Sequence, residues 1–337
     1  MPRGMQFTLF VTAMAWAAAA NMIAERAAAG ISVRFQFGMM ESLLENVFLL
    51  FLAVVGFRAL DWIATRSRYA GQVWPLPRRT GWRVEWAVGA AIGWGLCLAA
   101  VIPLVVSGHL HAQFIWNSNS IQGMVASVGS LLVGTLALEV VFHGYAFRRL
   151  IDSVGPSWAS VLISVLFAVL VVGANPPRNA MLATIDCTLF GLLLATAWLR
   201  TYALWVGWGL HFGYRAVMAV ALGLPIAGRA EFGSPTDMYT FGPRWLTGGA
   251  FGLDAAFLTF FVMLGGMAVL YRATREYAWQ YTFPTLEPAG YEVVVAPPAA
   301  HVAMEKAVAP PPLVQILATT PQTRSVIESP VESGPTS

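Results

Sequence analysis

The chain has 337 residues, of which 57% are hydrophobic and only 11% are charged. About a quarter of the residues of a soluble protein are charged, so this composition excludes an ordinary soluble enzyme and indicates an integral membrane protein. The net charge of +3 does not indicate nucleic-acid binding, because the arginines are scattered at the ends of apolar segments. Membrane lipids are therefore the expected surroundings, and no nucleic-acid partner is expected.

Eight apolar segments each approach the roughly 20 residues that a helix needs to cross a bilayer. In chain order they occupy about 6–24, 42–58, 84–107, 121–147, 157–173, 181–199, 203–223 and 247–271. We therefore predict an all-α fold, a polytopic membrane bundle of about eight transmembrane helices. Arg3 and the apolar run that ends at Ala20 also fit a secretory signal peptide. Whether the first segment is such a peptide or a retained helix stays open.

The chain is predicted to have three parts. Residues 1–120 would form N-terminal transmembrane helices, 121–272 a central transmembrane core, and 273–337 a cytoplasmic tail. Proline, serine and threonine become frequent from about residue 284, as in Pro310-Pro311-Pro312, so the tail is predicted to be disordered. Cys97 and Cys187 both fall in apolar runs, and no disulfide framework is expected.

The arginines predict the orientation, because cytoplasmic loops are enriched in positive residues. If the loop after the second segment is cytoplasmic, the inner segments hold Arg3, Arg58, Arg66, Arg68, Arg78, Arg79, Arg83, Arg148, Arg149, Arg200, Arg272 and Arg275. The outer segments hold fewer, namely Arg26, Arg34, Arg178, Arg229 and Arg244. We therefore expect a protein integral to the plasma membrane with both termini in the cytoplasm.

Two polar pairs interrupt the apolar segments, and a charge within a bilayer marks a candidate functional site. Glu139 and His143 lie one helical turn apart in the fourth segment, as do His211 and Arg215 in the seventh. At 1.5 Å per residue, Glu139 and His211 would lie roughly 13 and 12 Å below the inner surface. We therefore predict that these four side chains converge in the bundle interior. Asp186, near the outer end of the sixth segment, is the other charged residue set into an apolar run.

A series of different short motifs lies between about Leu132 and Leu270. In order they are Phe142-His143-Gly144-Tyr145 with Arg149-Leu150, Ala159 to Phe167, Phe190-Gly191-Leu192-Leu193, Leu199-Arg200-Thr201, Leu204-Trp205, Gly207-Trp208-Gly209-Leu210-His211, Gly223-Leu224-Pro225 and Leu246-Thr247-Gly248-Gly249. In this order and spacing they resemble the CPBP intramembrane endopeptidases, a family that includes CAAX prenyl proteases, bacteriocin-processing proteins and Abi proteins. The resemblance implies a helical membrane core and metal- or glutamate-assisted peptide hydrolysis within the bilayer.

The first two motifs of that family are altered in this chain. The first motif has two adjacent glutamates and an arginine four residues after the second, and these positions hold Leu138, Glu139 and His143. The glutamate that the family uses to activate water is therefore a leucine here. The second motif has a histidine four residues after a phenylalanine. Phe167 is present, but the histidine position is Val171.

The third motif is altered as well, because the family places Asn or Asp four residues after its histidine. His211 matches, but Arg215 stands at the second position. A general base must be a titratable group within reach of the attacking water, and neither Leu138 nor Val171 can act as one. A cationic Arg215 would also disfavour a nearby metal ion. The resemblance therefore implies that the ordinary family mechanism is lost.

Three hypotheses remain open for these residues. In the first, which the sequence favours, the protein has lost or altered its peptidase activity, Glu139 and Arg215 form a buried ion pair, and His143 and His211 bond around them. No cofactor is expected then. In the second, Glu139, His143 and His211 bind zinc in an active endopeptidase. Asp186 is then the only other carboxylate available as a base, and the substrate is a membrane-embedded peptide or protein. In the third, the cluster is an ion relay in a small-molecule or ion transporter.

Overall fold

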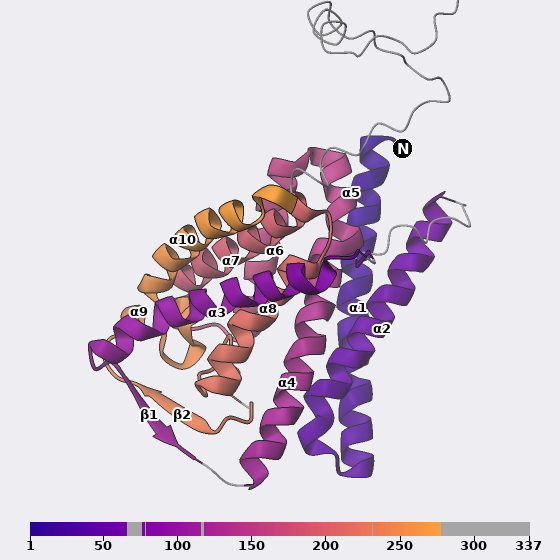
Figure 1. Ribbon diagram of the computed structural model, residues 1–337. Helices are drawn as coiled ribbons and strands as arrows, with labels where there is room; N and C mark the ends of the chain where they lie inside the picture. The colour runs from indigo at the N-terminus through magenta and orange to yellow at the C-terminus, as the bar shows by residue number, and fades with distance from the viewer. Residues whose placement is uncertain (66–75, 78, 116–117, 231, 278–337) are drawn as a thin grey trace, which may run out of the picture. The chain divides into compact units, whose positions relative to one another are not determined.

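The computed structural model describes residues 1–65, 76–77, 79–115, 118–230 and 232–277 (Figure 1). The first two helices, α1 (Arg3–Phe35) and α2 (Glu41–Thr65), pack side by side as a hairpin joined through the short helix η1 (Gly38–Met40). A buried stripe of small side chains on α1 allows the close approach: Ala13, Ala17, Ala20, Ala24 and Ala28. The indole nitrogen of Trp16 donates a hydrogen bond to the carbonyl oxygen of Leu52 at 3.0 Å.

Helix α3 (Trp82–Val106) packs against α8 (Trp205–Ala216) with the two backbones nearly in contact. A Cβ atom on Gly93 would lie 2.2 Å from the carbonyl oxygen of Leu210. On the facing helix, a Cβ atom on Gly213 would lie 2.3 Å from the carbonyl oxygen of Ala90. Helices in lipid have no hydrophobic driving force for association, and small residues stabilise such a crossing by allowing close van der Waals packing. The crossing fixes α8, which carries His211 and Arg215.

Helix α4 (Ser118–Glu139) continues through a single π-helical turn, η3 (Val140–Gly144), into α5 (Tyr145–Val154). Two antiparallel helices follow, α6 (Pro156–Ala174) and α7 (Ala180–Thr201), and they pack on each other. Helix α8 likewise ends in a π-helical turn, η4 (Val217–Ala221). The last elements are α9 (Arg244–Thr247), the turns η5 (Gly249–Phe251) and η6 (Leu253–Ala255), and α10 (Phe257–Ala273).

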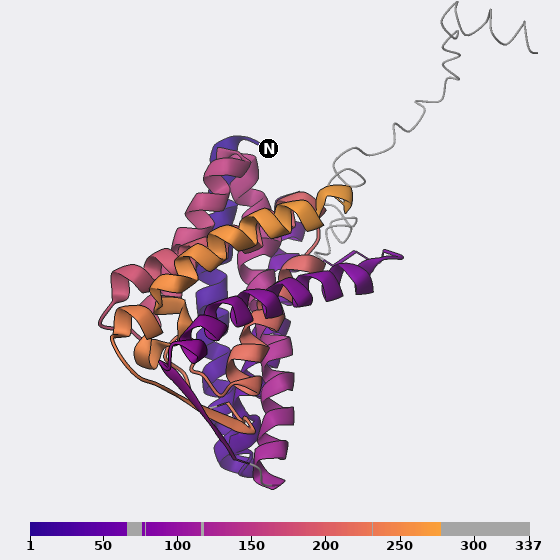
Figure 2. The same ribbon diagram turned by 60° about the vertical axis from the view of Figure 1, so that its left-hand side comes forward.

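Two short strands form an antiparallel ribbon at one end of the helices (Figure 1). Strand β1 (Leu110–Phe114) pairs with β2 (Thr236–Thr240) so that Leu110 faces Thr240 and Phe114 faces Thr236. The ribbon lies away from the N-terminus and from the end of α10, which are near the opposite end of the helices in both views (Figures 1 and 2).

The all-α membrane fold predicted from the sequence is confirmed. Within the described residues, six helical segments are long and apolar enough to cross a membrane: Arg3–Phe35, Glu41–Thr65, Trp82–Val106, Ile121–Val154, Pro156–Ala174 and Ala180–Thr201. The seventh predicted segment corresponds to α8 with its π-helical turn. The eighth begins later than predicted, at Phe257, because Gly248, Gly249 and Gly252 adopt positive φ angles in turns. Most of the predicted disordered tail, residues 278–337, lies outside the described residues.

Candidate functional site

Glu139, His143 and His211 form one buried hydrogen-bonded cluster, as their spacing predicts. Nδ1 of His143 lies 3.0 Å from Oε2 of Glu139, and Nδ1 of His211 lies 2.8 Å from Oε1. The three residues are only 1%, 1% and 2% exposed. A carboxylate can only accept hydrogen bonds, so both Nδ1 atoms carry the shared hydrogens. Each oxygen of Glu139 therefore has its own histidine donor.

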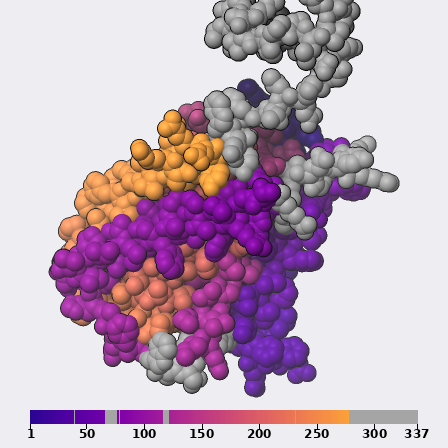
Figure 3. Space-filling model, viewed as in Figure 1, coloured from indigo at the N-terminus to yellow at the C-terminus, as the bar shows by residue number. Residues whose placement is uncertain are grey.

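The side chains of this cluster come from two helical segments, the end of α4 with η3, and α8. Glu139 is the last residue of α4, and His143 lies in the following π-helical turn. Such turns are rare insertions in α-helices and occur frequently at functional sites. Gly207, one turn before His211 on α8, makes room for the carboxylate, because a Cβ atom there would lie 3.2 Å from Oε2 of Glu139. Helix α3 covers the front of α8 in the space-filling view (Figure 3).

Aromatic rings enclose the histidines. The ring of Phe190 lies 5.2 Å from that of His211, and the ring of Phe167 lies 6.2 Å away on another helix. Phe147 meets His143 edge to face at 5.7 Å. Phe167 therefore occupies the place that the second motif predicts, while Val171, one turn farther along α6, supplies no polar group. These rings surround the hydrogen bonds with apolar material, which strengthens them.

The cluster does not fit the zinc site considered from the sequence. Both Glu139 oxygens bond to the histidines, so the carboxylate orients the two rings and does not stand beside them as a third ligand. A catalytic zinc site commonly has three protein ligands. Among the residues that the structure describes, no group of three His, Cys, Asp or Glu side chains is arranged to hold a metal ion. Zinc binding by this cluster stays an untested prediction.

Arg215 does not pair with Glu139, and that part of the first hypothesis is wrong. Arg215 instead forms a buried ion pair with Asp254, which lies in the turn η6 before α10. The side chains of the pair are 5% and 4% exposed. Arg215 is one helical turn beyond His211, and its guanidinium lies over the ring of Phe190 at 5.4 Å. That ring also contacts His211, so it lies between the two polar clusters.

Asp254 is the functional candidate that sequence reasoning missed, although it had a usable signal. It is an acidic residue within the apolar stretch from Leu246 to Met263, where a charge needs a partner. Asp186 was noticed in the sequence, but it does not join the histidine cluster. Asp186 is 1% exposed, and neither of its carboxylate oxygens has a hydrogen-bond partner within the described part of the chain.

Comparison with known proteins agrees with the motifs. Residues 120–217 match the family model Rce1-like, described as type II CAAX prenyl endopeptidase Rce1-like. The matched segment includes Glu139, His143, His211 and Arg215, but it ends before Asp254. No curated protein and no solved structure matches the chain. The chain therefore combines membrane helices with a central segment that is similar to the type II CAAX prenyl endopeptidases.

Proposed function

We propose that this protein is a CAAX protease-like membrane protein that does not hydrolyse peptides, and that its central polar cluster is a structural junction. The observation that supports this most is the bonding of Glu139, whose two oxygens both accept hydrogen bonds from histidine Nδ1 atoms. A general base must lie within reach of a water molecule, whereas Glu139 is only 1% exposed and each of its oxygens faces a histidine. The carboxylate instead ties the α4–η3 junction to α8.

The neighbouring positions support the same conclusion. Leu138 and Val171 occupy the places of a glutamate and a histidine in the family motifs, and neither side chain can transfer a proton. Arg215, at the place of an amide or carboxylate, is neutralised by Asp254 and not by the cluster. Two positions that carry acid–base groups in the family are apolar here, and Arg215 forms a buried ion pair with Asp254. Both changes favour a structural role of the site over a catalytic one.

The environment of the protein follows from its helices and arginines. We propose that it resides in the plasma membrane with both termini in the cytoplasm, because the predicted inner segments carry most of the arginines. Membrane lipids surround the bundle. A membrane-embedded peptide or protein is the proposed partner, which such a pseudoenzyme would bind without cleaving.

One observation favours retained hydrolysis as a second candidate. Nε2 of His143 is buried and has no hydrogen-bond partner among the described residues. A histidine whose Nδ1 is bonded to a carboxylate can accept a proton at Nε2, as in other hydrolytic sites. A water molecule held there would be activated by His143, with Glu139 orienting the ring. This mechanism does not require zinc, and a measurement of the metal content of the purified protein would show whether zinc is also bound.

Peptide cleavage in proteoliposomes separates the two candidates. The substrate is a farnesylated peptide that ends in a CAAX sequence, and an active type II CAAX prenyl endopeptidase serves as the positive control. We expect no more product with this protein than with empty liposomes. Cleavage by the wild-type protein that His143→Ala abolishes, with the variant still folded, would contradict the proposed function and establish the second candidate.

A further inference from the structure

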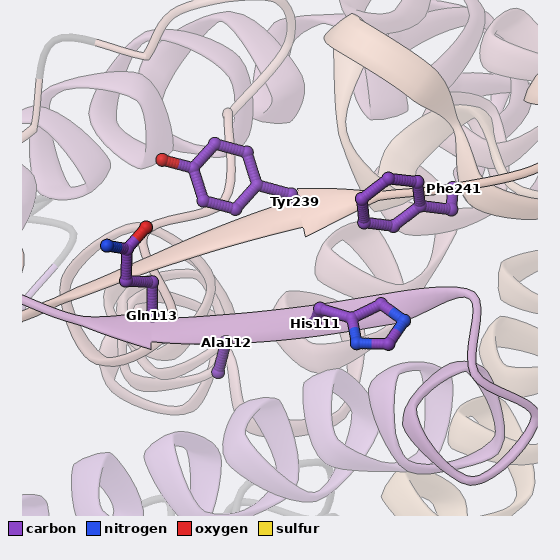
Figure 4. A pocket seen from close by; sticks show the side chains of 5 residues that line it. All are labelled: His111, Ala112, Gln113, Tyr239 and Phe241. Carbon is purple, nitrogen blue, oxygen red and sulfur yellow. The ribbon is translucent and has the colours of Figure 1, made fainter.

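One face of the β1–β2 ribbon gathers aromatic and polar side chains around a shallow hollow (Figure 4). The hollow has a volume of about 310 Å³ and is lined by His111, Ala112, Gln113, Tyr239 and Phe241. Successive side chains of a strand point to opposite faces, so alternate residues share one face. His111 is paired with Tyr239, and Gln113 with Asp237, which places these residues on the face that also carries Phe241.

The chemistry of this face combines apolar rings with hydrogen-bonding groups. The rings of His111 and Phe241 meet edge to face at 5.1 Å. The hydroxyl of Tyr239 donates a hydrogen bond to Asp237 at 2.7 Å. Tyr239 and Phe241 are nevertheless 46% and 55% exposed. Neither strand contains a lysine or an arginine, so the face offers rings, neutral polar groups and the carboxylate of Asp237, which accepts the Tyr239 hydrogen bond.

The ribbon is attached directly to membrane-spanning helices. Helix α3 ends at Val106 and β1 begins at Leu110, while α4 begins at Ser118, soon after β1 ends at Phe114. Large apolar side chains at these junctions remain uncovered, with Val106 82% and Phe114 80% exposed. The ribbon is thereby held close to the level at which the spans leave the hydrocarbon. Uncovered apolar groups at that level are stabilised by lipid and destabilised by water.

We propose that the aromatic face of the ribbon lies in the phospholipid headgroup layer of the leaflet opposite the N-terminus. Tyrosine and other amphipathic rings are enriched at this level, because one end is apolar and the other forms hydrogen bonds. The rings of Tyr239 and Phe241 contact the upper acyl chains. The side-chain amide of Gln113 donates hydrogen bonds to glycerol and phosphate oxygens. The ribbon thus anchors the loops between α3 and α4 and between α8 and α10 to the membrane surface.

Fluorophore labelling of the full-length protein in phosphatidylcholine vesicles tests this placement. Tyr239→Cys and Phe241→Cys are labelled separately with an environment-sensitive fluorophore. The native thiols of Cys97 and Cys187 are 0% and 1% exposed, so unmodified protein gives the background labelling. Trp94→Cys on α3 is the reference for the hydrocarbon region, since Trp94 is 56% exposed within a membrane span. The fluorophore coupled to free cysteine is the reference for water.

The proposal predicts a blue-shifted emission at both ribbon positions relative to the water reference. Nitroxides attached to lipid headgroups should quench it more strongly than nitroxides deep in the acyl chains, and Trp94→Cys should show the reverse order. Water-like emission without headgroup quenching, or quenching as deep as at Trp94→Cys, would overturn the proposal. A blue shift that disappears when the vesicles are diluted with lipid would assign the face to a second copy of the chain and overturn it equally.

Discussion

Replacing Asp254 with asparagine tests the buried ion pair that determines how Arg215 is accommodated. The substitution keeps the size of the side chain but removes the negative charge beside a guanidinium that is 5% exposed. At an effective dielectric constant of about 20, opposite charges about 4 Å apart attract by about 4 kcal/mol. Breaking a buried pair by removing one partner costs on the order of 3–5 kcal/mol. We therefore expect Asp254→Asn to lower the free energy of unfolding by an amount in this range.

A second substitution shows whether the loss comes from the pair. Arg215→Met removes the uncompensated charge while keeping a long side chain, so adding it to Asp254→Asn should recover most of the lost stability. Added to Glu139→Gln, it should lower the stability further, because it leaves the Asp254 carboxylate buried without its partner. Unfolding can be followed by tryptophan fluorescence in mixed micelles, as the chain has 13 tryptophans. If Arg215→Met rescued Glu139→Gln instead of Asp254→Asn, the assignment of the pair would be refuted.

Three further predictions concern packing and orientation. Gly93→Ala should strongly reduce the yield of folded protein, because its Cβ would meet the α8 backbone, while Gly95→Ala on the same helix meets nothing within 4 Å and should fold normally. Asp61→Asn should cost about 1–3 kcal/mol of stability in the same unfolding assay, since Asp61 pairs with the mostly buried Arg149 and so joins α2 to α5. A reporter active only in the cytoplasm should be active when fused after Ser337, and inactivity there would contradict the proposed orientation.

Much of the membrane architecture could be predicted because apolar segments of bilayer length leave few alternatives. The eighth segment was misplaced because hydropathy does not register turns. Leu246 and Phe251 are apolar, yet the glycines between them form turns, and the helix starts only at Phe257. The ribbon was also not predicted, because β1 and β2 are short and lie far apart in the sequence. Pairing between distant segments leaves little local signal.

The candidate site was predictable only where its residues share a helix or a depth. Glu139 and His143 are four residues apart, and the depth argument brought His211 to them. The partner of Arg215 was assigned wrongly because charge alone does not say which carboxylate is nearer. Only the fold shows that the turn carrying Asp254 reaches the end of α8. The spacing of residues in the sequence cannot show which of two carboxylates far from Arg215 in the chain will pair with it.

The central claim is that Glu139 stabilises the bundle and does not perform catalysis. The most direct measurement is the free energy of unfolding of Glu139→Gln, with Asp186→Asn as a control at another buried carboxylate. An amide has one acceptor and one donor end, so one histidine loses its partner, and the expected loss is about 1–3 kcal/mol. Asp186→Asn should lose less, because no hydrogen bond to Asp186 is present in the described residues. A Glu139→Gln protein that is as stable as the wild type but has lost peptide cleavage would contradict the account.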